Sequence, residues 1–220
     1  AFFKWQLFYA AGAMYHATHT VDLERLGGLA RWMRWTAGAF LVGGMAISAL
    51  PPVTGFASEF TLYSALFRVQ DMPLGARVAL CGVGALLAFV GAISALSITR
   101  AFGVAFLGTP RDPELPAVRE VNRWMLLPMG LHAAGVLVLG LFPALGLQML
   151  QGTVDLAQSL PGTGVSAGAQ AAADLTQALS RIGIVGALLL GLLLLVLAVR
   201  RWRARTLPQA QSVTWGCGYA

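Results

Sequence analysis

The stretch ISALPPVTGFASEF occupies residues 47–60 and lies within a longer apolar run. Its adjacent prolines, Pro51 and Pro52, each remove a helical hydrogen bond and clash with the preceding turn, so we expect a helix to break there. Inside a bilayer, freed backbone groups are tolerated only where they face protein or water. Glu59 follows about two turns later, where a charge costs roughly 2.5 kcal/mol or more unless it is paired or hydrated. This combination predicts a site that moves ions.

The composition indicates a membrane protein. Hydrophobic residues make up 57% of the 220 residues and charged residues only 11%, whereas soluble domains average about 25% charged residues. One lysine and fourteen arginines against nine acidic residues give a net charge of +6. Most arginines flank apolar segments. This placement argues against nucleic-acid binding and indicates that the arginines determine the orientation of membrane segments. Cys81 and Cys217 lie far apart without a CxxC motif, so no zinc, iron–sulfur or disulfide framework is expected.

The predicted fold is all-α: a polytopic transmembrane helix bundle with about five membrane segments. The segments cover about 1–15, 35–67, 78–106, 124–142 and 182–199, and the second is the proline-broken, discontinuous helix. We expect the long connection 143–181, rich in Ala, Gly and Ser, to be a loosely ordered loop with a short surface helix near 174–179. The chain opens directly in an apolar helix, which suggests a fragment of a longer protein.

The arginines predict the orientation of these segments. Eleven of the fourteen fall in or near the first and third connections and after the last segment, with Arg100 counted near the cytoplasmic end of the 78–106 segment, and three fall in the other two connections. By the positive-inside rule, the first and third connections and the C-terminus are expected in the cytoplasm. The 146–181 loop is then expected on the exoplasmic side.

Ionisable residues inside the membrane are the candidates for chemistry. The sequence has no GxSxG, HExxH, P-loop or Rossmann motif, so no catalytic centre is expected. Three residues could form a proton pathway: Lys4, Glu59 and, more weakly, His132. For Lys4 the alternative is a side chain that snorkels to the interface, and for His132 it is a hydrogen-bonded packing residue. His16 and His19 have a spacing that suits a metal, but two ligands alone are weak evidence and a solvent-facing helix end is an alternative.

Three motifs resemble the antiporter-like membrane subunits of respiratory complex I, Mrp cation/proton antiporters and group 4 hydrogenases. They are AFFK at residues 1–4, DLERLGGL at 22–29 and LPPVTGFASE at 50–59. The resemblance covers most of residues 1–145, followed by the 146–181 loop and a final helix with a basic tail at 182–220. The terminal WGCGY at 215–219 is similar to the tails of hydrogenase-4 and formate hydrogenlyase membrane subunits.

The resemblance implies a function and roles for individual residues. Lys4 matches a central proton-channel residue and Glu59 an exit-side residue, so a proton path from Lys4 to Glu59 is expected, with water entering at the break around Pro51, Pro52 and Gly55. It also implies no cofactor of its own and a multi-pass location in a prokaryotic plasma (inner) membrane. The expected partners are other membrane subunits and a soluble redox arm that carries the metal clusters.

Three alternatives stay open at this point. One is an Mrp-type or complex I subunit that carries Na⁺ or H⁺. Another is a structural membrane anchor of a hydrogenase complex, in which Lys4 and Glu59 merely pair for packing. The third is a quinone-reactive enzyme with a pocket open to lipid.

Overall fold

The structure of the chain is a computed structural model that describes residues 2–67, 72–112, 118–159 and 169–206. Helices account for all the regular secondary structure in these ranges. In chain order they are α1 (Phe2–Thr18), the short 3-10 helix η1 (Leu29–Arg31), α2 (Arg34–Ile47), α3 (Thr54–Phe67), α4 (Leu74–Phe106), α5 (Arg123–Leu141), α6 (Pro143–Ser159) and α7 (Ala169–Thr206). The predicted tail motif at 215–219 lies outside the described residues.

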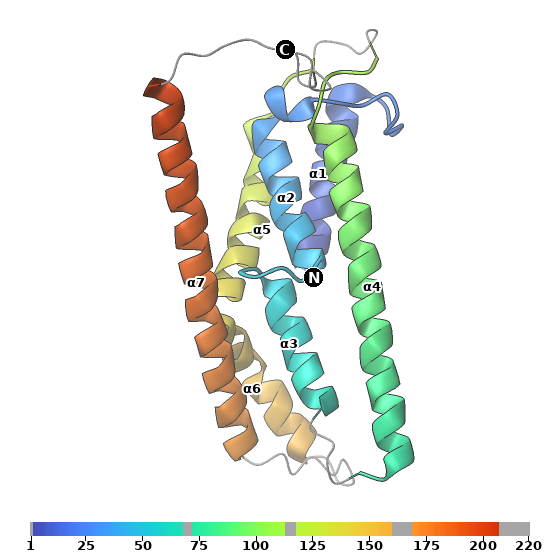
Figure 1. Ribbon diagram of the computed structural model, residues 1–220, viewed down its shortest axis with the longest axis vertical. Helices are drawn as coiled ribbons and strands as arrows, with labels where there is room; N and C mark the ends of the chain where they lie inside the picture. Colours follow the sequence, from blue (N-terminus) through green and yellow to red (C-terminus); the bar gives the residue numbers. More distant parts are fainter. Residues whose placement is uncertain (1, 68–71, 113–117, 160–168, 207–220) are drawn as a thin grey trace, which may run out of the picture.

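The helices form one bundle along a common long axis (Figure 1). α4 and α7 run along its full length on two sides, and the shorter helices lie between them. α2 and α3 follow one another end to end, and so do α5 and α6. At 1.5 Å per residue, the 33 residues of α4 and the 38 of α7 extend for about 50 and 57 Å.

The predicted all-α membrane bundle is confirmed. Among the described residues, three helices are long and apolar enough to cross a bilayer, namely Leu74–Phe106, Arg123–Leu141 and Asp174–Arg205. α1, with 17 residues, and the α2–α3 pair, with 14 residues each, account for the other two predicted segments. The predicted break is present between the ends of α2 and α3.

The loosely ordered loop predicted for 143–181 is wrong for its described parts, 143–159 and 169–181, which are helical. The short helix expected near 174–179 lies within α7. α6 continues from Pro143 to Ser159, and α7 starts at Ala169 rather than near residue 182. Pro143 occupies the first position of α6, where a missing N–H costs nothing. The Ala, Leu and Gln residues that fill both stretches are strong helix formers. A long helix also propagates into such residues more readily than a new helix can nucleate.

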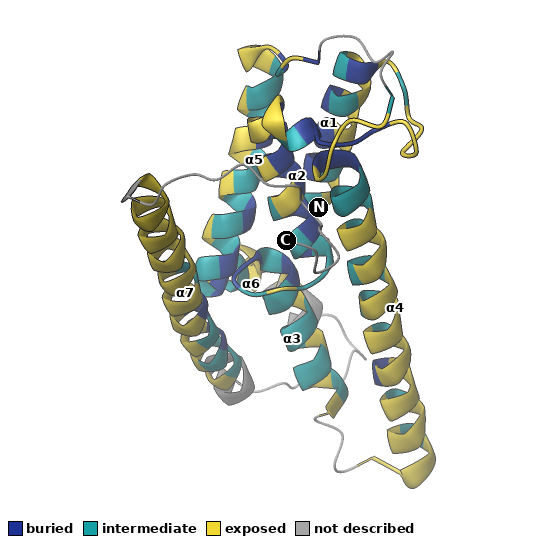
Figure 2. Cartoon of the chain, turned by 45° about the horizontal axis from the view of Figure 1, so that its top comes forward, coloured by how far each residue is buried: buried dark blue, intermediate teal, exposed yellow. Residues whose placement is uncertain are grey.

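Most buried apolar residues belong to two core clusters; Figure 2 colours all buried residues dark blue. The larger core joins α1, α2, α4 and α5 and includes Leu26, Met33, Phe106 and Met129. The smaller core, made of Ala46, Val53 and Val136, surrounds the helix break. Most of α4 and α7 is exposed and apolar, as expected for helices that face lipid.

Two connections are joined at the end of the bundle where α1 ends and α5 begins. Arg25 pairs with Asp112 at 2.6 Å, and Arg111 donates to the carbonyl oxygen of Leu26 at 2.9 Å.

Glu120 reaches the start of α2. Its Oε2 accepts from the Trp35 N–H at 2.8 Å, and its Oε1 accepts from the hydroxyl of buried Thr36 at 2.6 Å. Met33 supplies no side-chain cap. Glu120, which lies 85 residues after Trp35 in the sequence, therefore provides the acceptor for a free N–H at the start of α2.

Replacing Glu120 with alanine should weaken this end of the bundle. Losing a cap costs about 0.5–2 kcal/mol, and here it also leaves the Thr36 hydroxyl buried without its acceptor. We expect a loss of about 2 kcal/mol in the free energy of unfolding of the complete subunit in detergent micelles. Arg119→Ala, at the exposed neighbouring position, is the control and should change stability little. Equal losses in both variants would contradict the capping role.

Candidate functional site

The break between α2 and α3 spans residues 48–53. Pro51 and Pro52 have no N–H, so the carbonyls four residues earlier, on Ile47 and Ser48, lose their usual helical donors. The chain turns through Ala49, which has a positive φ of 49°. The Leu50 N–H then donates to the Met45 carbonyl at 3.0 Å. The peptide bond between the two prolines is cis.

One side of the break is packed without space for water. Pro52 and Val53 are buried, Val53 to 1% exposure. A Cβ added at Gly140 in α5 would overlap the backbone of Pro52 and Val53, and one added at Gly186 in α7 would lie 2.8 Å from the Pro52 Cβ. α5 and α7 therefore close this side of the break. The prolines shape the chain but do not face an aqueous cavity on this side.

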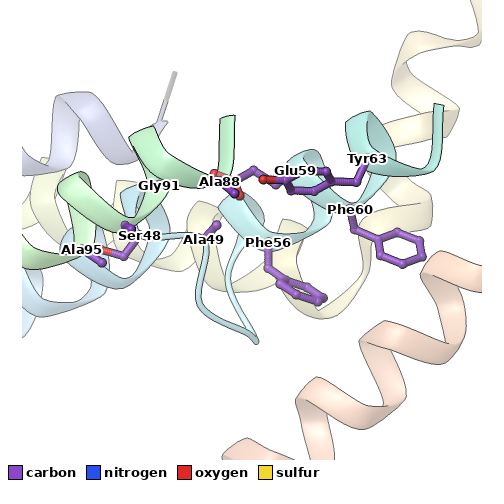
Figure 3. A pocket seen from close by; sticks show the side chains of 10 residues that line it. Ser48, Ala49, Phe56, Glu59, Phe60, Tyr63, Ala88, Gly91 and Ala95 are labelled. Carbon is purple, nitrogen blue, oxygen red and sulfur yellow. The ribbon is translucent and has the colours of Figure 1, made fainter. Parts of the chain in front are cut away.

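The other side of the break opens into a pocket of about 360 Å³ between α3 and α4 (Figure 3). It is lined by Ser48, Ala49, Phe56, Glu59, Phe60, Tyr63, Ala88, Gly91, Ala92 and Ala95. The α4 residues in this wall are all alanine or glycine, and their small size leaves the space open. Liquid water takes about 30 Å³ per molecule, so the pocket has room for roughly ten.

Glu59 is the one carboxylate of this pocket. It is half-buried, and its two oxygens lie 3.9 and 4.0 Å from the position that a Cβ on Gly91 would occupy. Among the described residues it has no hydrogen-bond or ionic partner. The other polar side chains of the pocket are the hydroxyls of Ser48 and Tyr63. Because the rest of the lining is apolar, water in the pocket would be the main source of hydrogen bonds to this carboxylate.

Lys4 lies elsewhere and does not line the pocket. It is exposed on α1. Gln6, two residues on and about 200° around the helix, is fully buried and donates to the Ala39 carbonyl of α2 at 3.1 Å. Lys4 therefore points away from α2. The structure of this chain does not bring Lys4 and Glu59 together.

His132 packs between α5 and α1. Its Nδ1 lies 2.8 Å from the Pro128 carbonyl oxygen. Since that oxygen can only accept, Nδ1 carries the proton. Its ring centroid is 5.6 Å from that of Phe2 and 5.3 Å from that of Tyr9, in an edge-on arrangement with Tyr9. His132 is also absent from the pocket lining.

His16 and His19 are both exposed near the end of α1. Within the described ranges, no three His, Cys, Asp or Glu side chains gather as metal ligands would.

Sequence reasoning missed two hydroxyl side chains beside Glu59. Tyr63 follows Glu59 by four residues, a spacing that places both on one helix face, so the sequence carried a signal for it. Ser48 directly follows α2, and only the geometry of the break brings it into the lining of the Glu59 pocket. The Gly91 wall comes from α4, more than thirty residues later, and no local pattern indicates that contact.

Comparisons with known proteins give the same family as the motifs. Residues 1–84 match the family described as NADH:quinone oxidoreductase/Mrp antiporter, TM. Hydrogenase-4 component B of Escherichia coli K12 is 39% identical over 137 residues, covering 61% of this chain and 20% of that protein. Formate hydrogenlyase subunit 3 of the same organism is 41% identical over 117 residues, covering 51% of this chain and 19% of that protein.

A solved structure supports the fold. The Mrp complex from Dietzia sp. DQ12-45-1b contains a chain that matches with a TM-score of 0.55 and 21% identity, over 80% of this chain and 37% of that one. The present chain thus spans about a fifth of the length of the two Escherichia coli relatives and about a third of this structural one. The three motifs and the shared fold agree with the match over residues 1–84, so this part of the chain is similar to the membrane subunits of the NADH:quinone oxidoreductase/Mrp antiporter family.

Proposed function

We propose that this chain is part of a proton-translocating membrane subunit of a redox-driven complex, of the hydrogenase-4 or formate hydrogenlyase type. The observation that supports this most directly is Glu59, half-buried beside a helix break in a pocket with room for water. A carboxyl group in this setting can bind a proton from one side and release it to another. The redox chemistry belongs to partner subunits, and this chain supplies no cofactor.

Lys4 and Glu59 are the two residues of the proposed pathway. Lys4 is exposed in this chain and outside the Glu59 pocket, so the proton reaches Glu59 from Lys4 through water and through other parts of the complete subunit. His132 is the weakest of the predicted pathway residues. Its contacts with Pro128, Phe2 and Tyr9 suit a packing residue.

The pocket favours a proton over Na⁺ as the transported ion. Hard cations bind through several oxygen ligands, and the side chains of this pocket offer only the Glu59 carboxylate and the hydroxyls of Ser48 and Tyr63. The remaining lining residues are Phe, Ala and Gly. If translocation required Na⁺ at constant ionic strength, the Mrp-type alternative would replace the proton proposal.

The proposed orientation places the basic end of the bundle in the cytoplasm. The connections after α1 and after α4, and the end of α7 with Arg200, Arg201, Arg203 and Arg205, lie at this same end (Figure 1). Arginines near membrane segments favour the cytoplasmic side. The soluble redox arm of the complex would dock on this side, and the Phe67 end of α3 would face the exoplasmic side.

Replacing Lys4 with alanine tests the pathway. In the complete complex, reconstituted in proteoliposomes, we expect proton translocation to fall at least about tenfold, because a proton-exchanging group is removed. Lys4→Arg should fail in the same way, since a guanidinium keeps the charge but does not release its proton. Proton uptake is measured together with the subunit content of the complex. Unchanged pumping with impaired assembly would instead identify Lys4 as part of a structural anchor.

A further inference from the structure

Tyr63 shares the pocket with Glu59 and comes one helical turn later in α3. The four-residue spacing puts the two side chains on one helix face, about 6 Å apart along the axis. Figure 3 shows both side chains directed toward the same side of α3, next to Ala88 of α4. The phenol and the carboxyl group therefore face the same space.

The ring of Tyr63 is held in place by its neighbour one turn further on. It stacks on Phe67 with centroids 6.3 Å apart and an interplanar angle of 10°. Phe67 is the last residue of α3. Tyr63 thus stands between Glu59 and the end of the helix, and its ring orientation does not depend on its hydroxyl.

The chemistry of the hydroxyl suits a relay. A phenol O–H both donates and accepts hydrogen bonds, whereas the other side chains that line the pocket beyond Ser48 and Glu59 are apolar. When the Glu59 carboxyl group gives its proton, through a water molecule in the pocket, to the Tyr63 oxygen, the Tyr63 O–H bond releases its own proton to the next water. Tyrosine ends neutral, Glu59 ends as a carboxylate, and one proton has moved to water toward the Phe67 end.

We propose that the Tyr63 hydroxyl is the relay group that takes the proton from Glu59 toward the Phe67 end of α3. This inference rests on the proposed function, because it needs Glu59 to carry a proton. It adds a residue to the path and gives the last step a direction along α3.

The test compares Tyr63→Phe with Tyr15→Phe in the complete complex in proteoliposomes. Tyr63→Phe keeps the ring that stacks on Phe67 and removes only the hydroxyl. Tyr15 is an exposed tyrosine of α1 outside the pocket, so it is the matched control. We expect translocation to fall about tenfold or more in Tyr63→Phe and to stay unchanged in Tyr15→Phe. The solvent deuterium isotope effect on translocation should rise in Tyr63→Phe, because proton transfer becomes the slow step.

Tyr63→Leu and Glu59→Gln separate the remaining explanations. If only Tyr63→Leu lowers translocation, the ring acts by packing and the relay is overturned. If Tyr63→Phe has normal translocation and a normal isotope effect while Glu59→Gln is inactive, the relay is again overturned and the proposed function stands. If Glu59→Gln also pumps normally, the proposed function itself fails.

Discussion

Replacing Glu59 with glutamine should stop proton translocation in the complete complex while its subunits still assemble. Glutamine has nearly the same size and fits the same space beside Gly91, but its amide cannot take up and release a proton. Removing a positioned acid–base group costs about 10²–10⁴-fold in rate, so we expect at least a hundredfold loss. Proton uptake in proteoliposomes, started by electron transfer, measures this loss.

Two further variants test whether the loss depends on the carboxyl group at position 59 and not on any lost negative charge. Glu59→Asp keeps a carboxyl group but draws it back by one methylene, so we expect a partial loss of translocation. Glu24→Gln removes a carboxylate from an exposed turn between α1 and η1 and should leave translocation unchanged. A fully active Glu59→Gln variant, or equal losses at Glu24 and Glu59, would refute a proton-carrying role for Glu59.

The sequence was most informative where one residue decides the local structure. Pro51 and Pro52 determine where the helix stops, because a missing N–H acts on its own turn regardless of the rest of the fold. The alternation of apolar runs and arginines likewise predicted the helical membrane bundle. Glu59 stood out because an acid inside an apolar run is costly in lipid.

The sequence was least informative where distant elements meet. That α4 supplies an Ala and Gly wall opposite Glu59 depends on how α3 and α4 pack, and neither helix has a strongly one-sided pattern in a membrane. For the same reason, the sequence left two alternatives open for Lys4, a buried proton-channel residue or a side chain that reaches the interface, and in this chain Lys4 is exposed on the far side of α1 from Gln6. The sequence does not predict α6, because Gly and Ser in 143–181 are typical of loops, although leucine and glutamine are the commonest residues of α6.

The helix break has two different sides, and that difference explains how it can serve a proton path. On the side of α5 and α7, Gly140 and Gly186 allow close contact with Pro52 and leave no room for water. On the side of α4, small residues leave the pocket that contains Ser48 and Glu59. Water that entered on both sides would hydrate the break throughout. With one side closed, water, and with it the proposed proton path, would be confined to the α4 side.

Replacing Gly55 with alanine should disrupt this arrangement more than any other single methyl group added to the break. A Cβ at Gly55 would overlap the carbonyl oxygen of Ala46, a backbone atom that cannot rotate away. α3 would have to move relative to α2, and with it Glu59 relative to Ser48. Overpacking of this kind costs about 1–3 kcal/mol and occasionally more, so we expect a loss of about 3 kcal/mol in the free energy of unfolding of the complete subunit.

Gly38→Ala is the matched control for this prediction. Gly38 also lies in a helix of the same pair, but a Cβ there meets no atom within 4 Å. Alanine is the better helix former by up to about 1 kcal/mol, so this variant should be as stable as the natural chain or slightly more stable. Chemical unfolding in detergent micelles measures both variants, and translocation in proteoliposomes should fall only in Gly55→Ala. If both variants were equally stable and active, the contact between Gly55 and Ala46 would not be what joins the two halves of the broken helix.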